Sequence, residues 1–164
     1  MVDWLTMLNM VETFGILIGV AIAIMQLLKL NKTNQAELFM TLYDSFHNKE
    51  FLRENIDIMM LEWEDFDDYW SKYGLNANPE ATALIHSVGN FYEGIGVLVK
   101  RKLIDLGLVD DLMSGLALRY WEKMGPMIIK QRELFGWPEA YEWTEYLYNE
   151  IQAIMEKEES ASRR

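Results

Sequence analysis

Residues 13–28 form one continuous apolar run, and no other part of the chain resembles it. The run carries no charge and is apolar on nearly every side of a helix, which predicts a membrane-spanning helix over about residues 10–30. A buried core helix is the alternative, because a span usually needs about 20 apolar residues. Further apolar residues on both flanks, from Trp4 to Met10 and from Leu27 to Leu30, favour the membrane.

The charges beside this run predict its orientation. Asp3 and Glu12 precede it, whereas Lys29 and Lys32 follow it. An acidic start argues against a cleaved signal peptide, which begins with a positively charged region. Because lysines near a span stay inside the cell, we expect a cell (inner, cytoplasmic) membrane protein. Its N-terminus would lie outside and its C-terminal domain in the cytoplasm.

Small and polar residues share one side of this predicted helix. At about 100° per residue they fall within a stripe about 80° wide, and they are Glu12, Gly15, Gly19, Ala23 and Gln26. Small residues four apart let two membrane helices approach closely. The stripe is therefore either an oligomer seam between packed helices or the lining of a pore, in which Glu12 would form a carboxylate ring.

The remaining chain shows the 3.6-residue period of helices and no sustained strand alternation. Residues 1–32 are expected to be the N-terminal segment, residues 33–157 a cytoplasmic helical domain and residues 158–164 a flexible tail. Helices are predicted from Asn34, over about 49–63, from Pro79, over about 109–123, from Pro126 to Gly136, and from Pro138. In the helix from Pro79 the expected core stripe is Leu84, Val88, Phe91, Ile95 and Leu98. The fold class is all-α, with a single N-terminal transmembrane helix followed by a helical bundle domain.

The chain has 164 residues and a formal net charge of −11, and the acidic excess lies entirely in residues 33–164. An acidic surface repels phosphates, so nucleic acid is not an expected partner. The absence of cysteine excludes disulfides, thiolate metal sites and a cysteine nucleophile. Expected partners are membrane lipid, further copies of the chain, and an unidentified protein or anionic ligand at the cytoplasmic domain.

The sequence offers no combination of residues typical of catalysis. Five acids between Glu62 and Asp68 lack the order of a calcium loop and favour a solvated acidic loop. His47 and His86 are not at metal-ligand spacing, and His86 is expected on the polar side of its helix. With no serine-nucleophile motif and no phosphate loop, we expect neither an enzyme nor a cofactor or metal site.

Two arginines fall on the apolar sides of their predicted helices. They are Arg119, near Leu112 and Leu116, and Arg132, between Ile128 and Ile129. A buried guanidinium needs an acidic partner or a bound anion. Arg119 and Arg132 are thus expected either in internal salt bridges or in an anion site.

Two segments carry a resemblance to a known family: Asn90 to Lys100 continuing through Leu103 to Asp105, and Tyr120 to Lys123 followed by Pro126 and Arg132. Over roughly residues 10–155 the chain resembles an uncharacterised prokaryotic family, a domain of unknown function, often with one N-terminal membrane helix. The resemblance implies an all-helical cytoplasmic domain behind a single span, and it implies no substrate or catalytic residue. A looser likeness, of architecture alone, is to the pore-forming membrane accessory of a Cas13-type CRISPR effector.

Two functional hypotheses follow. The first is a homo-oligomeric single-pass membrane protein, with a pore or channel built from the N-terminal helices and controlled by the helical domain. The alternative is a membrane-tethered binding or signalling module for a protein or an anionic ligand, without a pore.

Overall fold

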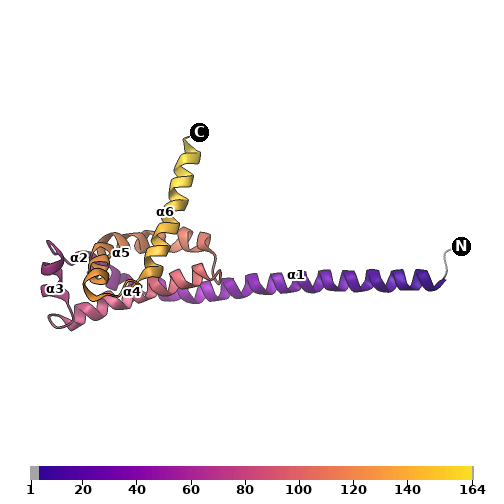
Figure 1. The fold of residues 1–164 in the computed structure, drawn as a ribbon, viewed down its shortest axis with the longest axis horizontal. Coiled ribbons are helices and arrows are strands. Elements are labelled where there is room, and N and C mark those ends of the chain that lie inside the picture. The colour runs from indigo at the N-terminus through magenta and orange to yellow at the C-terminus, as the bar shows by residue number, and fades with distance from the viewer. Residues whose placement is uncertain (1–3, 164) are drawn as a thin grey trace. The chain divides into compact units, whose positions relative to one another are not determined.

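A computed structural model describes the backbone of residues 4–163 and the side chains of residues 18–163. All regular structure in the described backbone is helical, which confirms the all-α prediction. The helices are α1 (Trp4–Phe46), α2 (Lys49–Met60), α3 (Phe66–Tyr73), α4 (Pro79–Lys100), α5 (Leu106–Phe135) and α6 (Glu142–Ser162) (Figure 1). The chain divides into two compact units, residues 1–40 and residues 41–164. The boundary lies inside α1, eight positions beyond the predicted one after residue 32.

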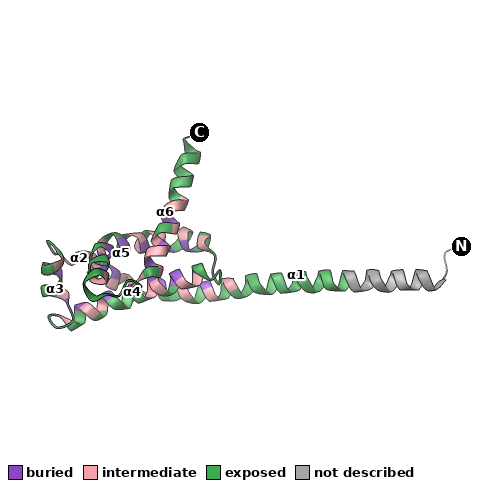
Figure 2. Ribbon diagram, in the orientation of Figure 1, coloured by how far each residue is buried: buried purple, intermediate pink, exposed green. Residues whose placement is uncertain are grey.

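The first unit is helical throughout its described backbone, so Asn34 lies inside α1 and does not start a new helix as predicted. Its side chains from residue 18 to residue 34 are all exposed (Figure 2). These exposed side chains include large apolar ones, such as Ile18 at 58% and Leu27 at 62% exposure. In residues 18–163, no helix carries a stretch that is both long and apolar enough to cross a membrane. Residues 13–17 of the apolar run lie outside the described side chains.

In the second unit, α4 packs against α2, α5 and α6, and most extensively against α6. Figure 1 shows α6 crossing α4 steeply. The largest fully buried side chains come from four helices: Ile58, Val88, Tyr92, Ile95, Met113, Tyr120, Met124, Leu147 and Ile151. Each such apolar side chain stabilises the fold by roughly 1.5–3 kcal/mol when removed from water.

The buried face of α4 differs from the predicted one. Val88 and Ile95 are buried as expected, but Leu84, Phe91 and Leu98 are only half-buried. The core instead takes Ile85, Tyr92 and Val99, so the true stripe is displaced by about one residue. Two glycines on this face explain the shift, because their missing Cβ atoms let neighbouring groups approach closely. A Cβ on Gly96 would collide with the Trp143 backbone, and one on Gly89 with the Tyr120 hydroxyl.

Three helix boundaries also differ from prediction. Helix α5 runs through Pro126 without ending, so the two helices expected on either side of this proline are one. Helix α3 forms inside the segment interpreted as a loop, where the Asp65 side chain accepts a hydrogen bond from the Asp68 amide. The last helix starts at Glu142 rather than Pro138, and it continues to Ser162, through most of the expected flexible tail.

A candidate ligand pocket in the helical unit

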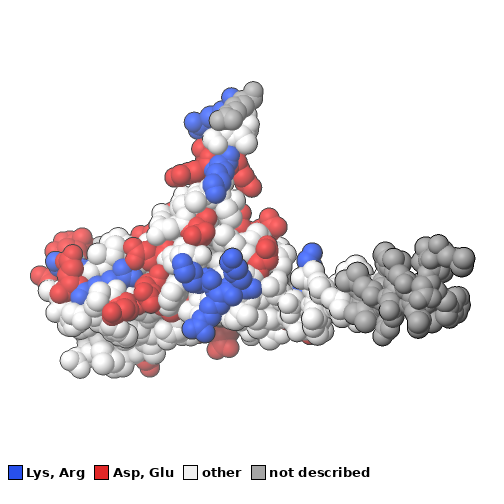
Figure 3. All heavy atoms as spheres, turned by 45° about the vertical axis from the view of Figure 1, so that its right-hand side comes forward, with Lys and Arg blue, Asp and Glu red and all other residues white. Residues whose placement is uncertain are grey.

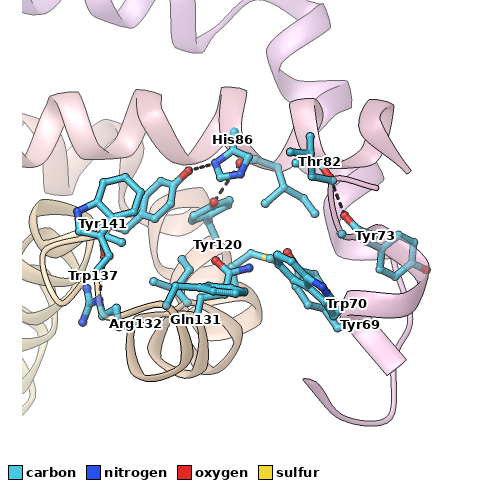
Figure 4. A pocket seen from close by; sticks show the side chains of 17 residues that line it. Tyr69, Trp70, Tyr73, Thr82, His86, Tyr120, Gln131, Arg132, Trp137 and Tyr141 are labelled. Carbon is cyan, nitrogen blue, oxygen red and sulfur yellow. Dashed lines mark hydrogen bonds between the residues drawn. The ribbon is translucent and has the colours of Figure 1, made fainter. Parts of the chain in front are cut away.

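The second unit contains a pocket of about 330 Å³ between α3, α4, α5 and the α5–α6 loop. Its lining is dominated by aromatic side chains, namely Tyr69, Trp70, Tyr73, Tyr120, Phe135, Trp137 and Tyr141. Apolar residues complete most of the wall, among them Leu75, Ile85, Met124, Ile128 and Ala140. Figure 4 shows Tyr141 and Trp137 on one side and Trp70 and Tyr69 on the other. The size is at the lower end of the range of about 300–1,000 Å³ typical of small-molecule sites.

Local backbone features place the walls. Helix α3 carries Tyr69 and Trp70, and its N-terminus is capped by Asp65. Helix α5 ends at Gly136, whose φ of 64° is a left-handed conformation that glycine adopts without strain. The chain then folds back, so that Trp137 and Tyr141 return to the pocket. Tyr141 also has positive φ, at 57°.

His86 and Tyr141 form the main polar contact at the pocket. The His86 Nδ1 lies 2.5 Å from the Tyr141 hydroxyl oxygen (Figure 4). Partial burial of the ring lowers the pKa of His86 below its ordinary value of 6.5, so the imidazole is neutral at neutral pH. Burial also raises the pKa of Tyr141 and that of Tyr120. These three groups are therefore all uncharged at neutral pH.

Tyr120 closes the pocket from the core side. Its hydroxyl donates a hydrogen bond of 3.1 Å to the Ile85 carbonyl oxygen, in the turn of α4 that also presents His86. The side chain is fully buried, and Gly89 leaves room for its hydroxyl. This hydrogen bond links α5, which carries Tyr120, to the turn of α4 that carries Ile85 and His86.

Arg132 contributes to the wall, but its guanidinium is engaged elsewhere. Its Nε donates to the Ala140 carbonyl oxygen at 2.7 Å, and its Nη1 donates to Glu145 at 2.5 Å. The guanidinium carbon also lies 5.7 Å from the centre of the Trp121 ring, a cation–π contact. The buried Nη2 has no hydrogen-bond partner. Arg132 thus ties α5 to the α5–α6 loop and to α6.

The mouth of the pocket exposes several large apolar side chains. Leu75, Phe135 and Trp137 are 61%, 58% and 63% exposed. The Trp70 and Phe135 rings lie 5.1 Å apart between centroids. Exposed apolar side chains gathered at one opening are typical of a binding site.

The residues predicted as an oligomer seam or pore lining lie on α1. Glu12 and Gly15 are outside the described side chains. Gly19, Ala23 and Gln26 are exposed, and a Cβ on Gly19 would have no atom within 4 Å. Within one chain this part of the stripe is therefore unobstructed.

The placement of Arg119 on a buried face was wrong. Arg119 is exposed, and it forms no ion pair with any residue in the described part of the chain. The buried stripe of α5 follows Met113, Ala117 and Tyr120 instead. Because Arg119 and Arg132 lie 13 positions apart on one helix, about 20 Å of rise separates their backbones. The two guanidinium groups consequently do not converge on one anion.

The acidic segment has structural roles. Asp65 caps α3, and Asp68 pairs with Lys72 at 2.7 Å. The Lys72 ammonium and the Glu64 amide lower the pKa of Asp68. Among the described residues, no group of three or more acids or histidines is arranged to hold a metal ion. Acidic side chains are also spread over the face shown in Figure 3.

The pocket itself was not anticipated from the sequence. His86 is exposed, as expected for the polar side of its helix, and it also lines the pocket. The one local signal available was Gly136 followed by Trp137, which marks an abrupt helix end with an aromatic side chain beyond it.

A family model described as "Domain of unknown function (DUF4760)" matches residues 13–151. The match includes α2–α5, the start of α6 and every residue that lines the pocket. Neither the curated proteins nor the solved structures contain a match to the chain.

Proposed function

Since the chain belongs to the DUF4760 family, whose description states no function, we propose from the structure that it is a membrane-anchored ligand-binding module. The ligand is a small, largely apolar molecule held in the pocket of the second unit. The observation that carries this proposal is the aromatic pocket of about 330 Å³ with its exposed apolar mouth. Covering that mouth removes apolar surface from water, which favours binding. No catalytic step is part of the proposal.

Anchoring is supported by the first unit. A helix whose apolar side chains are exposed on every side, as in residues 18–28, is unfavourable in water and requires an apolar environment. Lys29 and Lys32 follow at the end where headgroups would lie. Sedimentation of the full chain with cell membranes, resistant to high salt and to carbonate at high pH, would support the anchor. Recovery in the supernatant would contradict it.

The pocket is tested with three fluorinated probes that differ in charge: 5-fluoroindole, 5-fluoroindole-3-acetate and 5-fluorotryptamine. Binding to the purified full chain is measured by fluorine NMR line broadening, with protein-free detergent solution as the blank. Gln131→Trp fills the pocket, whereas Lys130→Trp adds the same side chain at the neighbouring exposed position, which is outside the lining. We expect at least one probe to bind the wild type and Lys130→Trp, and to bind Gln131→Trp at least about tenfold more weakly. Equal broadening by all three proteins, or none by any, would refute the proposal.

A homo-oligomer with a pore or channel of N-terminal helices is the second candidate. It is favoured by the exposure of Gly19, Ala23 and Gln26 along one side of α1. Because Gly19 has open space around it within the chain, Gly19→Leu does not disturb the monomer, and any effect reports on contacts between copies. Native mass spectrometry in mild detergent should give an assembly for the wild type and for Val20→Leu, but not for Gly19→Leu or Gly15→Leu. Five or more copies would permit a lumen, and a monomer would eliminate this candidate.

A further inference from the structure

We propose that the ligand of this pocket is an uncharged aromatic small molecule, an inference that rests on the proposed binding function. The charge state of the walls, the arrangement of the rings and the size of the site favour this class of ligand over the anionic ligand that the sequence suggested.

The walls offer no unmatched charge to a ligand ion. Burial raises the pKa of three tyrosines in the lining, Tyr69, Tyr120 and Tyr141, and lowers the pKa of His86, so these groups are neutral at neutral pH. The charged side chain in the lining is Arg132. The Arg132 charge is balanced by Glu145 at 2.5 Å, and the buried Nη2 that has no hydrogen-bond partner belongs to this same ion-paired guanidinium. A carboxylate or ammonium entering this site would lose hydration without gaining an opposite charge. A neutral ligand avoids that cost.

The arrangement of rings favours a flat ligand. Tyr141 and Trp137 face Trp70 and Tyr69 across the pocket, with His86 and Gln131 between the two sides in Figure 4. Aromatic pairs gain about 0.5–1.5 kcal/mol beyond their buried area when stacked or edge-to-face. A volume of about 330 Å³ suits one fused ring system rather than a lipid chain. The imidazole of His86 and the amide of Gln131 supply hydrogen bonds for one polar group on the ligand.

The order of affinities among the three indole probes, which differ in charge, tests the inference. We expect 5-fluoroindole to bind at least about tenfold more tightly than 5-fluoroindole-3-acetate and 5-fluorotryptamine, because only the charged probes lose hydration without compensation. A neutral saturated probe, 4,4-difluorocyclohexanol, should bind several-fold more weakly than 5-fluoroindole. Preference for either ion, or for the saturated ring, would overturn the inference while leaving the binding function intact. Failure of every probe would instead remove both.

A charge placed in the wall gives an independent check. His86→Lys puts an ammonium group into the pocket, whereas Ser87→Lys places the same group on the next, exposed residue, outside the lining. His86→Lys should raise the affinity for 5-fluoroindole-3-acetate at least about fivefold relative to Ser87→Lys, since the anion gains a partner of opposite charge. Equal affinities in the two variants would show that the acetate probe binds elsewhere, and would overturn the inference.

Discussion

The Glu93 carboxylate caps the N-terminus of α6 from the side of α4. One of its oxygens accepts hydrogen bonds of 2.8 Å from both the backbone amide and the hydroxyl of Thr144. Its other oxygen accepts a hydrogen bond of 3.3 Å from the Trp143 amide. The residue before α6, Tyr141, provides no side-chain cap. A glutamate about 50 positions earlier in the chain therefore supplies what a local serine or aspartate usually supplies.

Replacing Glu93 by alanine should lower the free energy of unfolding by about 1–3 kcal/mol, because the first amides of α6 and the buried Thr144 hydroxyl lose their acceptor. The matched control is Glu122→Ala, since Glu122 is exposed on α5 and follows an aromatic residue just as Glu93 does. Urea denaturation of the full chain, followed by near-ultraviolet circular dichroism, measures both variants. Equal losses in the two would show that the cap does not stabilise the fold.

Gly96→Ala should destabilise the second unit strongly, by about 2 kcal/mol or more, because the added methyl group meets the Trp143 backbone rather than a movable side chain. Gly94→Ala is the control on the same helix, where no atom lies within 4 Å of the added carbon. There alanine should increase stability by about 0.5–1 kcal/mol, since it favours the helix over glycine. Thermal unfolding distinguishes the pair, and a stable Gly96→Ala protein would contradict the packing of α4 on α6.

Tyr92 and Asn55 form a buried hydrogen bond between α4 and α2. The Tyr92 hydroxyl donates to the Asn55 Oδ1 at 2.9 Å, and the Asn55 amide nitrogen donates to the Phe51 carbonyl oxygen at 2.8 Å. Tyr92→Phe leaves that buried Oδ1 without a donor and should cost about 1–2 kcal/mol. Tyr148→Phe removes a half-buried hydroxyl and should change stability by less than about 0.5 kcal/mol. Chemical unfolding of both variants gives the comparison, and an unaffected Tyr92→Phe would refute the assigned role.

Acid should weaken the fold through His86. Burial holds the pKa of His86 in the folded protein below its ordinary value of 6.5. At pH values between the lowered pKa of the folded protein and 6.5, the unfolded chain binds more protons than the folded protein does. The free energy of unfolding therefore increases with pH in this range. The contribution of the neutral ring is complete above pH 6.5 and is lost as the pH falls through the lowered value. The difference in unfolding free energy between the wild type and His86→Gln should shrink between pH 7.5 and pH 5, and a constant difference would contradict this assignment.

The helical nature of the chain follows from its sequence, because apolar periodicity, capping residues and prolines act over a few neighbouring positions. Pro79 begins α4, and Gly136 ends α5, as the local pattern predicts. The apolar character of residues 13–28 is likewise a property of composition alone.

Only the tertiary structure decided which face of α4 is buried, which acid caps α6, and where the aromatic side chains form a pocket. Several faces of α4 are apolar enough for a core, and the choice was made by Gly89 and Gly96, whose partners Tyr120 and Trp143 lie far away in the sequence. The repeat of apolar residues along α4 does not show which face is buried, because shape complementarity exists only once two helices meet. Arg132 shows the same limit: its sequence position predicts partial burial, but its ion pair with Glu145 depends on how the loop between α5 and α6 turns.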